Sequence, residues 1–175
     1  MPPIHRRGFL QAGALGGLIL AGCERPADSA TPADAPPSLT PSERADLAAI
    51  ASRILPSDDG TPGAREANVI GFIERALTTF YAFRLPAFQA GLADLSRRAG
   101  SSFAALPPER QDALLHEIET TPFFEGARIL TMCGMFGDPS WGGNREQAGW
   151  KLLGFDPRGI WEPPFGAYDG KPEGA

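Results

Sequence analysis

Few side chains in this 175-residue sequence have the types and spacing that catalysis needs. Two neighbouring carboxylates, Asp58 and Asp59, could act as a general acid and base, but paired acids in a loop rich in glycine and proline are usually solvated turn residues. The two histidines, His5 and His116, stand far apart, and His116 lies on the polar face of an expected helix, without a metal-binding neighbour. The sequence contains no GxSxG, HExxH, P-loop or GxGxxG motif. An enzyme that acts alone through Asp58 or Asp59 is therefore the weakest hypothesis.

Cysteine offers a different chemistry, the covalent attachment of lipid. The run Leu20-Ala21-Gly22-Cys23 resembles the lipobox of bacterial lipoproteins, in which the cysteine thiol is acylated and becomes the new N-terminus. Such a lipid would hold the protein on a membrane surface, because each buried CH₂ contributes about 0.8 kcal/mol. Cleavage by the ordinary signal peptidase, with Cys23 left by chance, is the alternative. Cys133 is expected to pack in the core, so the sequence predicts no disulfide framework and no cysteine metal site.

Residues 1–22 have the organisation of a secretory signal, with a basic start, an uncharged and mildly apolar run, and small residues at the end. The apolar run is shorter than the about 20 residues that a transmembrane helix needs. Arg6 and Arg7 precede Phe9 and Leu10 in the register of a twin-arginine translocation signal. An ordinary Sec signal with two incidental arginines is the alternative. The sequence thus predicts export from a bacterial cytoplasm.

Composition limits the size of the domain and the class of its partners. The length fits one domain, and a hydrophobic content of 42% is enough for a core, while 21 glycines and 18 prolines indicate long irregular stretches. The net charge is −5, and the sequence has no basic cluster. Because nucleic-acid binding needs a positive surface, we do not expect a nucleic-acid partner.

Four segments follow from these patterns. Residues 1–22 are the signal peptide with its lipobox, and residues 23–39 are a tether rich in proline and alanine that is expected to stay disordered and solvated. Residues 40–157 form the folded domain, and residues 158–175 form an irregular C-terminal tail. The tether would hold the folded domain away from the membrane.

The folded domain has the pattern of an all-α protein. Thr40, Pro41 and Glu43 combine an N-cap hydroxyl, a proline at the first helical position and a glutamate three residues after the cap. Strand-like alternation is absent, so we expect a single compact domain of about six short helices joined by proline-rich turns. These helices are expected to begin near Pro41, Val69, Pro86, Pro108, Pro122 and Arg145. The inward stripes are expected to carry Leu47, Ile50, Ile54, Val69, Ile70, Ile73, Leu77, Phe80, Phe88, Leu92, Leu95, Leu114, Leu115 and Ile118.

The most unusual stretch is residues 134–155, in which glycines alternate with two tryptophans and two phenylalanines. Glycine permits backbone conformations that other residues avoid, so a tight loop is expected between the last two helices. Asn144 would suit the N-cap of the last helix. Two interpretations stay open: a turn whose aromatic side chains close the core, and a patch that faces a partner, for which aromatic and arginine side chains are typical anchors.

This stretch resembles the gluconate 2-dehydrogenase subunit 3 family. The resemblance is carried by Asp138-Pro139 followed by Trp141-Gly142-Gly143-Asn144, then Gly149-Trp150-Lys151 and Gly154-Phe155. Earlier pieces of the chain agree, from Leu55-Pro56 to Ile73, so that the resemblance covers about residues 47–155. Trp141 stands where the family pattern leads us to expect tyrosine.

The resemblance implies a small accessory subunit of a membrane-associated flavin dehydrogenase. In such complexes a large FAD-containing subunit oxidises a sugar, sugar acid or polyol, and a cytochrome subunit with haem c takes the electrons. The small subunit resembles an escort or chaperone, because it carries the twin-arginine signal while the large subunit commonly has none. No cofactor is expected in the small chain itself.

We therefore hypothesise a non-catalytic subunit on the periplasmic side of the cell envelope that is lipid-anchored to the membrane through Cys23. Its expected partners are the FAD subunit, the cytochrome c subunit and the twin-arginine translocase. The residues expected to bind the partner are Trp141, Gly142, Gly143, Asn144, Trp150 and Lys151. A free-standing periplasmic lipoprotein that binds a small ligand or an envelope partner is the alternative, because an escort does not require a lipobox.

Overall fold

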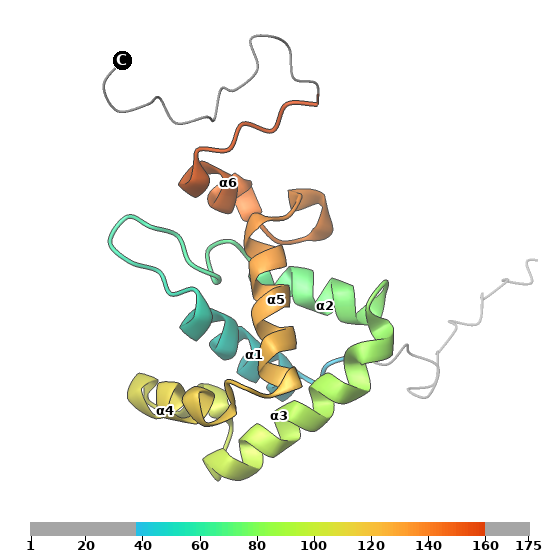
Figure 1. The fold of residues 1–175 in the computed structure, drawn as a ribbon, viewed down its shortest axis with the longest axis vertical. Coiled ribbons are helices and arrows are strands. Elements are labelled where there is room, and N and C mark those ends of the chain that lie inside the picture. The colour runs from blue at the N-terminus through green and yellow to red at the C-terminus, as the bar shows by residue number, and fades with distance from the viewer. Residues whose placement is uncertain (1–37, 160–175) are drawn as a thin grey trace, which may run out of the picture. The chain divides into compact units, whose positions relative to one another are not determined.

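The computed structural model describes residues 38–159, which lie within one compact unit and are entirely helical apart from loops and one isolated bridge between Asp58 and Thr61. The signal residues Arg6, Arg7, Phe9 and Leu10, and the lipidation residue Cys23, lie outside this range. The α-helices are α1 (Pro41–Ile54), α2 (Val69–Thr78), α3 (Leu85–Ala99), α4 (Pro108–Ile118), α5 (Pro122–Phe136) and α6 (Ala148–Leu153) (Figure 1). Short 3₁₀ helices occur at η1 (Ala82–Arg84), η2 (Phe103–Ala105), η3 (Pro139–Trp141) and η4 (Arg145–Gln147). The predicted all-α class is confirmed.

Local capping signals place the helix ends. At the start of α1 the Thr40 amide donates to the Glu43 carboxylate at 2.7 Å, and the Glu43 amide donates to the Thr40 hydroxyl at 3.2 Å, which completes the predicted capping box. Proline also occupies the first turn of α3, α4 and α5. Helix α3 ends at Gly100, whose φ of 70° suits glycine. The starts of these four helices agree with the predicted ones.

The core forms where α5 crosses α1 and α2 (Figure 1). Helix α2 buries Val69, Phe72, Ile73, Ala76 and Leu77 on one side. The facing residue on α5 is Gly134, where an added Cβ would lie 3.0 Å from a methyl carbon of Val69. A larger residue at this position would push the two helices apart, so glycine sets how closely they pack.

One buried carboxylate ties α1 to the segment after α3. Asp46 is 2% exposed, and it accepts hydrogen bonds from the Ser102 hydroxyl at 2.6 Å and from the Ala104 amide at 2.9 Å. Because a buried charged group is costly unless it is hydrogen-bonded, these two donors make its position on the inner face of α1 possible. The sequence patterns did not single out Asp46.

Three sequence expectations are wrong. Phe80, expected on the inward stripe of the second helix, follows the end of α2 and is 54% exposed. Cys133, expected in the core, is exposed, because Ala127, Leu130 and Gly134 define the inner face of α5. The sixth helix begins at Ala148 and not at Arg145, since the two residues before Ala148 have positive φ angles.

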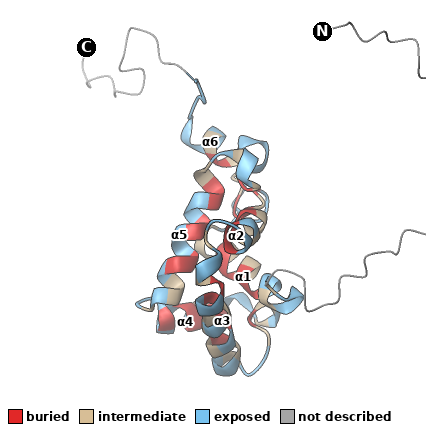
Figure 2. Cartoon of the chain, turned by 90° about the vertical axis from the view of Figure 1, so that its right-hand side faces the viewer, coloured by how far each residue is buried: buried red, intermediate tan, exposed pale blue. Residues whose placement is uncertain are grey.

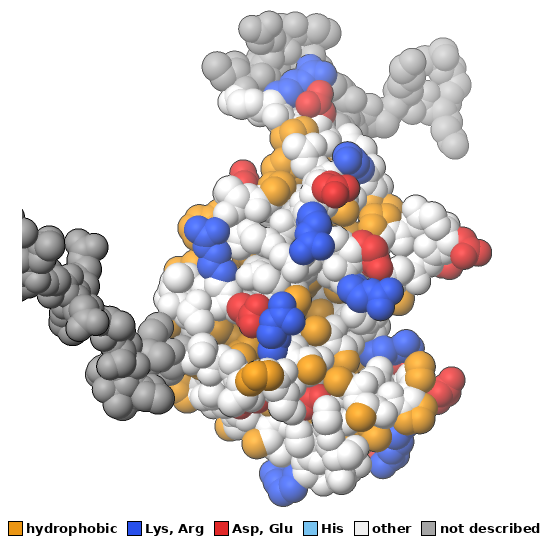
Figure 3. Space-filling view, turned by 180° about the vertical axis from the view of Figure 1, so that it is seen from behind, with side chains coloured by type: hydrophobic (Ala, Val, Ile, Leu, Met, Phe, Trp, Pro, Cys, Tyr) orange, Lys and Arg blue, Asp and Glu red, His pale blue; other side chains and the backbone are white. Residues whose placement is uncertain are grey.

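The surface carries mixed charge. On the side opposite the view of Figure 1, basic and acidic side chains are interspersed and do not gather into one patch (Figure 3). His116 is on the exposed side of α4, beside Glu119, as expected for a solvated helix residue. Within residues 38–159 no helix has both the length and the apolar character that a membrane crossing requires.

Candidate protein-interaction site

The stretch after α5 folds back onto the end of that helix. The last carbonyl groups of a helix have no partner inside it. Here the Asn144 amide donates to the Gly134 carbonyl at 2.7 Å, and the Trp150 indole N–H donates to the Phe136 carbonyl at 2.7 Å. The Gly137 carbonyl accepts from the Asn144 side chain at 2.8 Å. Residues 138–150 therefore act as a cap for α5, and this explains the asparagine and the second tryptophan in structural terms.

Asn144 is the centre of this arrangement. Its side chain is fully buried, and its Oδ1 accepts from the Gly149 amide at 2.8 Å while its Nδ2 donates to Gly137. Its φ of 43° lies in the left-handed region, which asparagine adopts more readily than most residues. The sequence pattern predicted that Asn144 is the N-cap of the last helix. The residue directly before α6 is Gln147, but the Asn144 side-chain oxygen Oδ1 does accept from an amide in the first turn of α6.

Glycine is required where this segment touches α5. A Cβ on Gly143 would lie well inside van der Waals contact with the Gly134 carbonyl, which is backbone and cannot rotate away. On its other side the segment meets the start of α2, where the Asn68 side chain donates to the Gly142 carbonyl at 2.7 Å. The Arg145 amide donates to the Ala67 carbonyl at 3.0 Å. The glycine-rich motif therefore joins α5, α2 and α6.

At the surface of this segment lies an aromatic cluster. Trp141 is 45% exposed, and its ring meets Phe80 edge to face, with 5.3 Å between ring centroids. The Arg75 guanidinium lies 5.1 Å from the centre of the Trp141 ring and donates to the Ser140 carbonyl at 2.6 Å. The cation–π contact and the hydrogen bond fix the indole in an outward position. We call Arg75, Phe80 and Trp141 the Trp141 cluster.

The cluster continues along the chain into η1. Tyr81 and Phe83 pack edge to face at 5.0 Å, and Phe83 is 75% exposed. Large apolar side chains that gather at a surface mark interaction sites more often than single ones do. Phe80 and Phe83 were not among the predicted binding residues, because neither lies in a recognisable motif.

The six residues predicted to bind a partner are thus divided between surface and interior. Trp141 and Lys151 are exposed, Gly142 and Trp150 are half-buried, and Gly143 and Asn144 are buried within the domain. Trp150 packs edge to face on Phe155, at 5.2 Å. The two buried residues hold the loop, and Trp141 is the member of the six that lies in the aromatic cluster.

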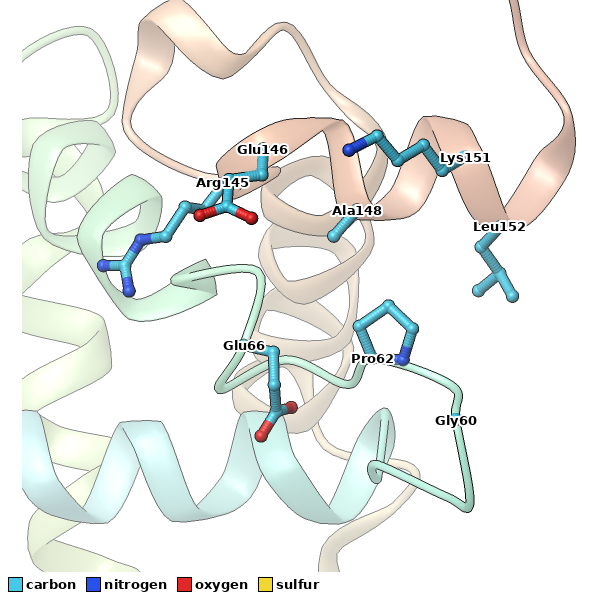
Figure 4. Close-up of a pocket in the computed structure, with 8 residues that line it drawn as sticks. All are labelled: Gly60, Pro62, Glu66, Arg145, Glu146, Ala148, Lys151 and Leu152. Atoms are coloured by element: carbon cyan, nitrogen blue, oxygen red, sulfur yellow. The ribbon is translucent and has the colours of Figure 1, made fainter.

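A hollow of about 420 Å³ lies between the loop before α2 and helix α6 (Figure 4). It is lined by Gly60, Pro62, Glu66, Arg145, Glu146, Ala148, Lys151 and Leu152. The Glu66 carboxylate turns away from η4 and α6, and it accepts hydrogen bonds from the Ser57 hydroxyl and from the Gly63 amide. The Ser57 bond is the main cause that lowers the pKa of Glu66 to about 2. Through these hydrogen bonds Glu66 stabilises the loop before α2.

Asp58 and Asp59 lie on the exposed turn of the same loop and do not line the hollow. The Asp58 carboxylate accepts from the Asp59 amide at 2.8 Å, which is the hydrogen bond of a turn. Among residues 38–159 there is no group of three or more histidine, cysteine and acidic side chains that could hold a metal ion.

The comparison with known families gives one match. The model of the family described as gluconate 2-dehydrogenase subunit 3 matches residues 41–157, which include all six α-helices and the whole glycine-rich motif. No curated protein and no solved structure matches the chain.

Proposed function

Because the chain belongs to the gluconate 2-dehydrogenase subunit 3 family, we propose that it is the small, non-catalytic subunit of a membrane-associated, FAD-dependent dehydrogenase. The partner would be a large FAD subunit that oxidises a sugar, sugar acid or polyol, and a cytochrome subunit with haem c would accept the electrons. The match over residues 41–157 is the observation that carries this proposal.

The first role of the chain is to escort the large subunit during export. Insertion of FAD requires a folded apoprotein, and the twin-arginine route moves folded proteins. Arg6, Arg7, Phe9 and Leu10 supply the signal for that route. A large subunit that is bound in the cytoplasm is then exported together with the chain that carries the signal.

The second role is to keep the complex at the membrane. Acylation of Cys23 places the chain on the periplasmic side of the envelope, and the proline-rich tether separates the helical domain from the lipid. The large subunit then stays beside its electron acceptor.

The Trp141 cluster is the surface proposed for docking. Its exposed aromatic side chains and its arginine are residue types that dominate binding energy at protein interfaces. Binding to the folded, FAD-loaded form of the large subunit stabilises that form by mass action. The capping segment supports this role indirectly, since it fixes the position of Trp141 through Gly142 and Asn144.

The test separates export from anchoring. In one strain Arg6 and Arg7 are both replaced by lysine, and in a matched strain Cys23 is replaced by serine. The first change should trap the large subunit and its dehydrogenase activity in the cytoplasm. The second should leave export intact and release the complex from membranes. Normal periplasmic activity of the large subunit in a strain that lacks this chain would overturn the proposal.

The lipobox favours one second candidate, a free-standing periplasmic lipoprotein, because escort alone needs no lipid. A neighbouring gene for a flavoprotein without its own signal peptide supports the dehydrogenase subunit. Isolation of the chain without any flavoprotein supports the lipoprotein.

A further inference from the structure

Two arginines beside the exposed aromatic side chains have no carboxylate partner among the described residues. Arg75 bonds a backbone carbonyl and the Trp141 ring. The side chain of Arg84, at the end of η1, forms neither a hydrogen bond nor an ion pair within residues 38–159, and its Nε is buried without an acceptor. Arg44, Arg53 and Arg128 are paired with acids, while Arg110 and Arg145, like Arg75 and Arg84, form no ion pair within the described residues.

Ring contacts and chain order link these two arginines to the exposed aromatic side chains. Arg75 lies against Trp141, Trp141 against Phe80, and the chain runs from Phe80 through Tyr81 and Phe83 to Arg84. In Figure 2 the domain is seen from the side on which α2 lies. We call this surface, which consists of the Trp141 cluster with Tyr81, Phe83 and Arg84, the arginine-aromatic surface.

The acids nearest in the sequence, Glu74 and Asp138, form no ion pair with Arg75 or Arg84. Glu74 pairs with Arg44 at 2.8 Å, and Asp138 accepts from the Ser140 amide at 2.8 Å. The chain as a whole carries a net charge of −5. The surface therefore combines unpaired positive charge with apolar side chains in a protein that is otherwise acidic.

From this combination we propose that the arginine-aromatic surface receives an acidic, apolar segment of the large subunit, with carboxylates that pair with Arg75 and Arg84. The inference rests on the proposed function and names the chemistry of the partner. A planar guanidinium binds a carboxylate through two parallel hydrogen bonds, and such bonds are stronger between charged groups. Because the Nε of Arg84 is buried, a carboxylate of the partner would pair with the terminal N–H groups of this arginine.

Chemical cross-linking in the native complex tests this pairing. The chain has lysine only at positions 151 and 171, so a cross-link formed by an added lysine can be assigned to that position. The variants Arg75→Lys and Arg84→Lys keep the positive charge and introduce an amine, which a carbodiimide joins directly to a neighbouring carboxylate. Each variant is isolated from membranes with its bound subunits, treated and digested, and the joined peptides are identified by mass spectrometry. The matched control is Arg110→Lys, an exposed arginine on α4 that forms no ion pair within the described residues.

We expect Arg84→Lys and Arg75→Lys to join Asp or Glu residues of the large subunit, and Arg110→Lys to join none. Joined peptides that come from a second copy of this chain would overturn the inference, and so would a large subunit that is retained but joined by neither variant. Absence of any flavoprotein from the wild-type preparation would instead contradict the proposed function.

Charge reversal gives an independent measurement. Arg84→Glu should lower the amount of large subunit that is retained at least tenfold, because the new carboxylate would repel the carboxylate of the partner. Arg110→Glu should leave the retained amount unchanged. Thermal unfolding of both variants by circular dichroism checks that the domain still folds. A folded Arg84→Glu variant that retains the large subunit as well as the wild type would overturn the inference.

Discussion

Replacing Asn144 by alanine should destabilise the domain more than any surface substitution, because several losses coincide at one buried position. The side chain accepts from the Gly149 amide and donates to the Gly137 carbonyl, both at 2.8 Å. Loss of these bonds costs about 1 kcal/mol each, and leaving the Gly149 amide unpaired adds about 1 kcal/mol more. Alanine at a φ of 43° adds roughly 1 kcal/mol of backbone strain. The expected loss is therefore about 4 kcal/mol.

Urea unfolding followed by far-UV circular dichroism measures this loss, with the Cys23→Ser chain as the parent so that no lipid is attached. The expected loss corresponds to a decrease in Tm of roughly 10–15 °C for a domain of this size. Asn144→Gly removes the same hydrogen bonds without the strain, so it should cost about 1 kcal/mol less than Asn144→Ala. Arg110→Ala is the surface control and should stay within about 0.5 kcal/mol of the parent. A loss below about 1 kcal/mol for Asn144→Ala would refute the assigned role of this side chain.

Three further predictions address other parts of the fold. Asp46→Ala should lower the free energy of unfolding by about 3 kcal/mol, because it leaves the Ser102 hydroxyl and a backbone amide without their acceptor; a loss below about 1 kcal/mol in urea unfolding would contradict this. Gly143→Ala should cost about 2 kcal/mol or more, since the added methyl meets backbone, while a similar change at the open position Gly159 should cost little; equal effects would rule out the steric reason. Glu66 has a pKa lowered from 4.5 to about 2, so its contribution to stability is present above pH 4.5 and is lost as the pH falls toward 2. Glu66→Gln should therefore flatten the decline of stability over this pH range, and an unchanged decline would show that Glu66 does not cause it.

Sequence patterns located the helices well where the signals are local. The capping box of Thr40 and Glu43 and the glycine after α3 act within one helical turn, so they can be read without knowledge of the fold. The same is true of Thr121, whose hydroxyl accepts from the Phe124 amide at the start of α5.

Hydrophobic patterns did not predict the buried face of a helix that carries apolar residues on both sides. Helix α5 is apolar on both faces: Leu130 is buried, but Ile129, Met132 and Cys133 on the other side are exposed. Its inner face is set by small residues that let α2 approach, and this depends on a helix that is distant in the sequence. Hydrophobic periodicity could not therefore decide the position of Cys133.

The candidate site was located in the sequence but its organisation was not. The motif around Trp141 indicated an unusual segment, and yet its buried members form a helix cap and only part of it reaches the surface. The partners of Trp141 are Arg75 and Phe80, which lie about sixty residues earlier in the chain. Contacts over such distances follow from tertiary packing, which no local pattern records.

The most direct test of the central claim is to isolate the tagged chain from membranes and to record the absorbance spectrum and the mass-spectrometric composition of what accompanies it. Our account predicts a large subunit with bound FAD, seen as flavin absorbance, in a fixed ratio to the small chain. Recovery of the chain alone, without flavin, from cells grown on several carbon sources would contradict the account and would favour the free-standing lipoprotein.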